Sequence, residues 1–155
     1  MAGEIEAALA QHGITLPTPA APAGSYMPVV QTGSLLFVSG QLPMGTDGLS
    51  FVGRCGEDIS VEDAQSAAKL CAVNILAQVK ATAGSLDKIV RVVKLNGYVN
   101  STAQFRDHPK VVNGASDFLV AILGDKGRHA RAAVGVANLP FGASVEVEAV
   151  VEVAP

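Results

Sequence analysis

The stretch Val145-Glu146-Val147-Glu148-Ala149-Val150-Val151-Glu152-Val153 decides the fold, because apolar and acidic residues alternate along most of it. Successive side chains of an extended chain point to opposite faces of a sheet. We therefore predict a strand near residues 144–153. Its odd-numbered positions are small or branched apolar residues that share one face, and its three glutamates share the other.

Four more segments upstream are predicted to be strands. Residues 26–31 and 34–40 form a pair that can turn at Thr32-Gly33. Residues 89–99 are rich in Val and Ile and suit a central strand, and residues 130–136 form another. Residues 43–56 hold four glycines and are expected to be a loop, with an edge strand near Phe51.

Two helices are predicted between these strands. Ser60 can cap the first, in which apolar residues recur at helical spacing until Gly84 ends it. Pro109 suits the first turn of the second helix, and Gly124 is its expected stop. Residues 1–22 precede this pattern and are expected to hold a short helix over residues 3–12 and then an extended proline-rich segment.

This order of elements predicts a single α+β domain over residues 1–155, with two helices on one face of a mixed, mainly antiparallel sheet. Two helices cover only one face, whereas several strands are apolar on both. Hydrophobic residues make up 49% of the chain and charged residues 16%. We therefore expect another copy of the chain to cover the second face.

The bulk composition narrows the possible partners. The formal charge is −3 and the basic residues are scattered, so a nucleic-acid partner is not expected. No apolar run is long enough to span a bilayer. Only Cys55 and Cys71 are present, and the N-terminus lacks a signal-peptide pattern, so a reducing, cytoplasmic location is expected. Cys71 lies on a helical apolar face and is expected in the core.

Arg131 is the most informative charge, because it begins the strand Arg131-Ala132-Ala133-Val134-Gly135-Val136 among small neighbours. Its face also carries Ala133 and Gly135, which would leave room beside the guanidinium. A guanidinium there can bind a carboxylate through two parallel hydrogen bonds. The alternative is an arginine at a strand end that reaches water or pairs with a glutamate.

Glu146 and Glu148 share a face of the last strand. If that strand pairs with the one carrying Arg131, a carboxylate and the guanidinium would flank one cavity. The carboxylate could then orient or deprotonate a water molecule. The alternative is a solvated face of an exposed strand.

Other polar residues are weaker candidates. Tyr26, Ser39 and Asn113 lie at element ends or on an otherwise apolar helix, where turn or cap roles are common. His129 lies two residues before Arg131 and is a candidate for the same cavity. The histidines lack partners at metal-ligand spacing, so neither a metal nor another cofactor is expected.

Several of these segments together resemble a known family. They are Ser39-Gly40-Gln41-Leu42-Pro43, then Val111-Val112-Asn113, and the run from Arg131 through Asn138-Leu139-Pro140 to Val145-Glu146-Val147-Glu148-Ala149. From about Tyr26 to the C-terminus the chain resembles the RidA/YjgF family, often labelled endoribonuclease L-PSP.

The resemblance implies a chorismate-mutase-like fold and a homotrimer with active sites in clefts between subunits. It implies hydrolysis of 2-imino or 2-enamino acids to 2-keto acids and ammonia. By similarity, Arg131 holds the substrate carboxylate, Glu146 places the attacking water, and Tyr26, Ser39 and Asn113 line the pocket. The chain departs from the family at Ala133, where a cysteine is common, and in its N-terminal extension and its longer region between Asn113 and Arg131.

Three functions remain open from the sequence. The first is a deaminase of reactive imines, in which Arg131 fixes the carboxylate. The second is an endoribonuclease, against which the acidic charge and unclustered histidines argue. The third is a non-catalytic protein that binds small carboxylates with the same residues.

Overall fold

The computed structural model describes residues 3–19, 21–22 and 24–155. A five-stranded sheet forms one layer, with the strand order β1-β2-β7-β5-β6. All its strand pairs are antiparallel except β5 with β6. The strands of this sheet are β1 (Val29–Thr32), β2 (Leu35–Gln41), β5 (Ile89–Asn100), β6 (Ala130–Val136) and β7 (Val145–Val153). This confirms the predicted α+β class with a mixed, mainly antiparallel sheet.

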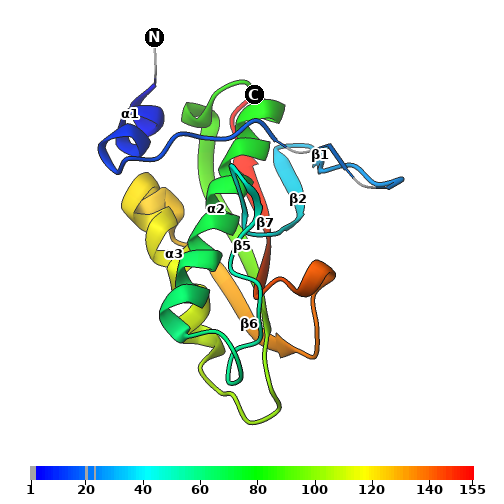
Figure 1. Cartoon of the computed structure of the whole chain (residues 1–155). Coiled ribbons are helices and arrows are strands. Elements are labelled where there is room, and N and C mark those ends of the chain that lie inside the picture. The colour runs from blue at the N-terminus through cyan, green and yellow to red at the C-terminus, as the bar shows by residue number, and fades with distance from the viewer. Residues whose placement is uncertain (1–2, 20, 23) are drawn as a thin grey trace.

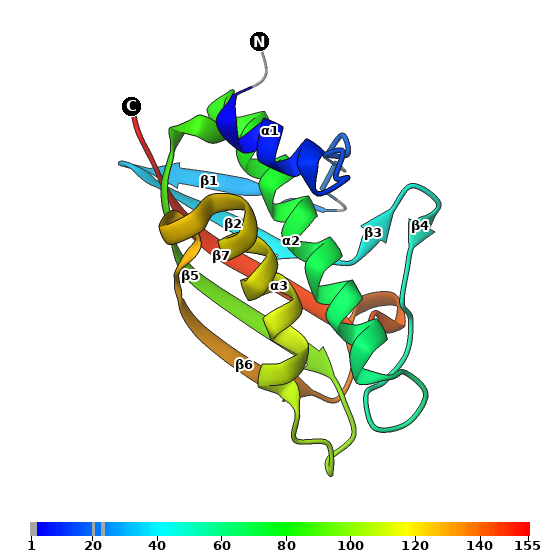
Figure 2. The same ribbon diagram turned by 90° about the vertical axis from the view of Figure 1, so that its left-hand side faces the viewer.

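Two long helices form the second layer, and they lie on the same face of the sheet (Figures 1 and 2). They are α2 (Val61–Ala83) and α3 (His108–Leu123). The Ser60 hydroxyl accepts a hydrogen bond from the Asp63 backbone N–H, and Gly84 adopts a φ of 87° at the other end of α2. Both ends are therefore where the capping residues predict them.

Strand β7 lies at the centre of the sheet between β2 and β5. Its odd-numbered residues are buried beneath the helices, whereas its even-numbered residues are only partly buried. The predicted alternation is therefore confirmed. Cys71 of α2 is fully buried in the same core, as expected.

The connection β5–α3–β6 forms a parallel βαβ unit. Short 3-10 turns precede it at η1 (Leu86–Lys88), follow α3 at η2 (Gly124–Gly127), and follow β6 at η3 (Pro140–Gly142). The unit places β6 at the edge of the sheet with α3 packed above it, which sets the position of Arg131.

The N-terminal extension begins with helix α1 (Glu4–Gln11), which packs beside α3 and η1. Glu6 forms an ion pair with Lys80 of α2 at 3.0 Å, and the Ile5 backbone N–H donates to the Asp87 carboxylate at 3.2 Å. This confirms the predicted short helix. The proline-rich segment after it has no regular secondary structure in its described residues, and Ala20 within that prediction lies outside them.

Two boundaries differ from the prediction. Strand β1 begins at Val29 rather than at residue 26, after Pro28, which has no backbone N–H to donate. The expected edge strand near Phe51 is instead the small hairpin β3 (Met44–Gly45) and β4 (Gly48–Leu49). Gly48 permits its tight turn by adopting a φ of 101°.

In the described part of the chain, no helix covers the face of the sheet opposite α2 and α3 (Figure 1). We call it the open face. Apolar side chains stand on it, and Val30, Phe37 and Val134 remain 52%, 46% and 46% exposed. Within residues 3–19, 21–22 and 24–155, no helix combines the length and the hydropathy that a membrane span requires.

Gly114 sets how closely α3 approaches α2. A Cβ atom at this position would lie 2.8 Å from the carbonyl carbon of Gln65, well inside van der Waals contact. We expect Gly114→Ala to lower the free energy of unfolding by ~1–3 kcal/mol, as overpacking does. This loss would occur although alanine favours a helix by about 1 kcal/mol.

Urea denaturation of the two proteins measures this difference. Asp117→Ala, an exposed change on the same helix, serves as the control and should stay within about 0.5 kcal/mol of the unchanged chain. A Gly114→Ala protein more stable than the original would contradict the close packing of the two helices.

Candidate active site

Arg131 is half-buried on β6, and its side chain points to the helical layer. In the β5–β6 register it lies opposite Leu95, a fully buried residue of the helix-facing side. Its Nη1 group donates to the Asn113 side-chain oxygen at 2.7 Å and to the Ser116 hydroxyl at 3.1 Å. Both acceptors come from one face of α3, because residues three apart on a helix are neighbours.

These two bonds use one side of the guanidinium and leave the other side free. Nη1 has two N–H groups, and Asn113 and Ser116 accept from both. Nη2 reaches only the Pro109 carbonyl at 3.5 Å, a long and weak contact. The Nε and Nη2 groups are the pair that can bind both oxygens of a carboxylate in parallel.

The charge of Arg131 has no counter-ion in the described part of the chain, where the ion pairs join other residues. Beside it lies a shallow hollow of about 250 Å³, lined by Ser116, Val120, Arg128, His129 and Arg131. A half-buried guanidinium without a carboxylate partner is suited to an external anion. The predicted room beside the guanidinium is present as this hollow, but Gly135 does not line it: a side chain at Gly135 would meet the His108 ring and the Ser101 hydroxyl.

His129 lines the same hollow as Arg131, as its position in the sequence suggested. Its Nδ1 lies 2.6 Å from the Gly127 carbonyl, and its Nε2 lies 2.9 Å from the Ser116 hydroxyl. Burial lowers the pKa of His129, and the charge of Arg131 lowers it further, against a hydrogen bond to Gly127 that raises it. The ring is therefore neutral at neutral pH.

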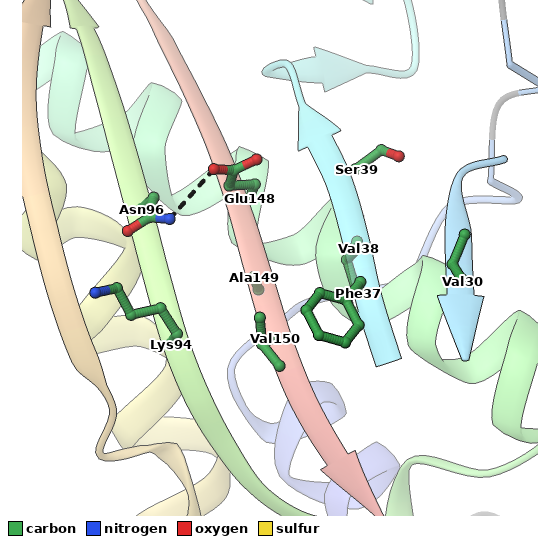
Figure 3. A pocket seen from close by; sticks show the side chains of 9 residues that line it. All are labelled: Val30, Phe37, Val38, Ser39, Lys94, Asn96, Glu148, Ala149 and Val150. Atoms are coloured by element: carbon green, nitrogen blue, oxygen red, sulfur yellow. Dashed lines mark hydrogen bonds between the residues drawn. The ribbon is translucent and has the colours of Figure 1, made fainter. Parts of the chain in front are cut away.

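The acidic pair of β7 stands on the open face. Glu148 accepts a hydrogen bond from the Asn96 amide at 3.2 Å (Figure 3). It also accepts one from the Tyr98 hydroxyl at 2.6 Å. The bond to Glu148, with a smaller contribution from burial, raises the pKa of Tyr98 to about 12. The Glu148 carboxylate is thus fixed between two donors from β5.

Glu146 lies opposite Tyr98 in the register of β5 and β7. Burial raises its pKa, and the charge of Glu148 raises it further. Its carboxylate packs against Gly40 of β2, where an added Cβ would lie 2.9 Å from the carboxyl carbon. Glycine at this position therefore gives the carboxylate its space.

A hollow of about 390 Å³ lies on the open face beside Glu148 (Figure 3). Ser39 and Phe37 of β2 line it, together with Lys94 and Asn96 of β5. The Ser39 hydroxyl donates to the Met27 carbonyl at 2.8 Å. Tyr26 precedes β1 and is 53% exposed.

The condition for a cavity shared by Arg131 and Glu146 within one chain, that their two strands pair, is not met. Strand β5 lies between β6 and β7. Arg131 faces α3, whereas Glu146 pairs with Tyr98 on the open face. Within one chain, the five predicted residues therefore divide into two groups: Arg131 and Asn113 on the helix side, and Ser39 and Glu146 on the open face, with Tyr26 before β1. The alternation grouped Glu146 with Glu148 and Arg131 with Ala133, but it could not assign strand neighbours.

The sequence reasoning did not single out Ser116, Asn96 or Tyr98. Ser116 follows Asn113 by three residues on a helix, and this spacing was the available signal. Asn96 and Tyr98 alternate with Leu95, Gly97 and Val99, which marks them as residues of one sheet face. Among the described residues, no three His, Cys, Asp or Glu side chains gather as a metal site would require.

Comparison with known proteins adds an independent observation. Residues 6–152 match the family model described as "YjgF/chorismate mutase-like, putative endoribonuclease". The chain is 48% identical to Protein TCP17 of Trypanosoma cruzi, over 97% of this chain and 94% of that protein. It is 30% identical to a 2-iminobutanoate/2-iminopropanoate deaminase of Dermatophagoides farinae, over 89% of this chain and 93% of that protein.

Solved structures give the same fold. A crystal structure of an Agrobacterium tumefaciens protein of unknown function is 53% identical and superposes with a TM-score of 0.92. The match covers 97% of this chain and 93% of that one. The arrangement of α2, α3 and the five-stranded sheet is therefore shared with a solved relative.

The charge of Glu148 contributes to the raised pKa of Glu146, and this contribution can be tested. We expect Glu148→Gln to lower the pKa of Glu146, because it removes the nearby negative charge while the amide oxygen can still accept from Tyr98. Carboxyl ¹³C NMR titration of the full chain measures this shift. Glu152→Gln, farther along the same face, is the matched control and should change the Glu146 pKa much less. An unchanged or higher pKa in Glu148→Gln would contradict the coupling.

Proposed function

The chain belongs to the YjgF/chorismate mutase-like family, and from this premise we propose that it is a hydrolytic deaminase of reactive 2-imino and 2-enamino acids. Its products are the 2-keto acid and ammonia. In this proposal Arg131 binds the substrate carboxylate, Glu146 acts on the attacking water, and Tyr26, Ser39 and Asn113 line the pocket. The named activity of the Dermatophagoides farinae relative supports this class of reaction.

One observation carries the proposal: the Arg131 guanidinium is held on one side and, in the described part of the chain, faces no carboxylate on the other. Asn113 and Ser116 hold Nη1, while Nε and Nη2 face no carboxylate of the described chain. A fixed guanidinium with one free edge selects a planar anion and sets its orientation. Binding the carboxylate in this way removes rotational freedom from the substrate before reaction.

The chemistry that follows requires little activation. The carbon of an iminium ion is already electrophilic, so water adds to it, and the resulting carbinolamine expels ammonia to leave the 2-keto acid. Glu146 accepts the proton of the attacking water and returns a proton to the departing nitrogen. Its raised pKa supports this role, because a general base works best when its pKa approaches the working pH.

The separation of Arg131 and Glu146 requires a second copy of the chain. We propose a homotrimer in which the open face of one copy approaches the β6 edge of the next. Each cleft then combines Arg131 and Asn113 of one chain with Glu146 and Ser39 of another. The exposed apolar residues of the open face support such an interface, since monomers rarely leave large apolar patches uncovered.

We expect Arg131→Ala to lower kcat/KM for imine hydrolysis by roughly 30-fold or more, since truncating a desolvated charged partner costs ~2–5 kcal/mol. A pyridoxal-phosphate dehydratase that releases 2-aminoacrylate supplies the substrate, and 2-keto acid formation is followed. Arg128→Ala is the matched control. Arg128 borders the same hollow but is 71% exposed and pairs with Asp125, so its loss should change the rate little.

Equal rates for Arg131→Ala and the original chain would refute this assignment. Carboxylate binding without keto-acid release would favour the non-catalytic alternative. RNA cleavage that survives purification and disappears in Arg131→Ala would favour the endoribonuclease alternative.

The proposed trimer gives a separate prediction. Phe37→Asp places a charge on the open face and should convert the trimer into monomers, because burying an unpaired carboxylate is costly. Light scattering coupled to size-exclusion chromatography measures the mass. Ala121→Asp adds the same charge on the exposed side of α3 and should leave the mass unchanged. A Phe37→Asp protein that remains trimeric would exclude the open face as the interface.

A further inference from the structure

The hydroxyl of Ser116 makes unusual contacts for a serine inside a helix. A helical serine commonly donates to the carbonyl four residues earlier. Ser66 on α2 does so, and its hydroxyl lies 3.3 Å from the Glu62 carbonyl. Ser116 on α3 instead contacts the His129 ring at 2.9 Å and the Arg131 guanidinium at 3.1 Å.

The direction of each hydrogen bond around Ser116 follows from the groups that can only donate or only accept. The Gly127 carbonyl can only accept, so His129 carries its proton on Nδ1. In the neutral ring Nε2 then accepts, and the Ser116 hydroxyl must donate to it. Arg131 can only donate, so it donates Nη1–H to a lone pair of the same Ser116 oxygen.

We propose that His129 is a positioning residue that holds the Ser116 hydroxyl toward Arg131, so that the free edge of the guanidinium is presented to the substrate carboxylate. Because His129 accepts the hydrogen bond of the Ser116 hydroxyl, that hydroxyl does not donate to the helix carbonyl four residues earlier. Ser116 and Asn113 then fix Nη1 together, and the Nε–Nη2 edge keeps one orientation. This inference rests on the proposed carboxylate-binding role of Arg131 and adds a residue that acts through another.

We call the chain of hydrogen bonds from His129 through Ser116 to Arg131 the relay. Its surroundings favour the positioning role of His129. Val120 of α3 lines the hollow with His129, and the positive charge of Arg131 acts on the ring. A charged imidazolium would be disfavoured there, which agrees with the lowered pKa of His129. Asp117, the acidic neighbour of Ser116 in sequence, is exposed on α3. A neutral ring can accept from Ser116 throughout the neutral range.

The test measures the Kd of pyruvate, a 2-keto acid of the product class, for the full chain by calorimetry. Ser116→Ala and His129→Phe should each weaken pyruvate binding by roughly tenfold, the typical effect of losing one hydrogen bond to a charged group. His129→Gln should bind nearly as tightly as the original chain, because its side-chain oxygen can take the place of Nε2 as acceptor.

The double variant Ser116→Ala/His129→Phe distinguishes a relay from two independent effects. If His129 acts through Ser116, the double variant binds pyruvate as weakly as Ser116→Ala alone. A multiplied loss, or equal binding by His129→Phe and His129→Gln, would overturn the proposal. Ring ¹⁵N NMR should find the His129 proton on Nδ1, and a proton on Nε2 would also overturn it. If His129→Phe does not fold, the proposal is tested by the pyruvate Kd of Ser116→Ala and by the NMR position of the His129 proton.

His108 provides a matched control, because its Nε2 also contacts a serine hydroxyl, that of Ser101, at 3.1 Å. His108→Phe should leave the pyruvate Kd unchanged.

Arg131→Ala separates this inference from the proposed function. If Arg131→Ala binds pyruvate normally, the carboxylate role itself is wrong. If Arg131→Ala loses binding while Ser116→Ala and His129→Phe retain it, only the relay is wrong.

Discussion

Two helices can cover only one face of a five-stranded sheet, and the rest of the molecule follows from this constraint. Strand β7 fits this one-sided cover, because its odd-numbered residues are buried under α2 and α3 and its carboxylates lie on the open face. The same division places Arg131 under α3 and Glu146 on the opposite side. The proposed catalytic centre therefore needs residues from two copies of the chain.

The asymmetry of the Arg131 guanidinium connects the fold to its proposed chemistry. One nitrogen is held by two side chains of α3, and the opposite edge remains free. If a glutamate of the same chain contacted that edge, Arg131 would form a structural ion pair with it. Since the three glutamates of β7 lie on the other face, the guanidinium keeps its capacity to bind an anion.

The sequence predicted the elements well where local chemistry decides them. Ser60 and Gly84 marked the ends of α2, and the alternation of β7 assigned Glu146 and Glu148 to one face. Strand neighbours were beyond its reach, because pairing joins residues far apart in the chain and β5 separates β6 from β7. The contacts of Ser116 were missed for a similar reason: they depend on how α3 is rotated above β6, which periodicity alone does not set.

The parallel unit β5–α3–β6 contains the two side chains that accept hydrogen bonds from Arg131, Asn113 and Ser116, and also His129, which contacts Ser116. Glu146 and Gly40 belong to segments outside it. In the proposed function, carboxylate binding and water activation therefore depend on separate stretches of the polypeptide. On this proposal, a relative that keeps the arginine and lacks the glutamate would bind small carboxylates without hydrolysing imines, so the arginine alone would mark a ligand class and not a reaction.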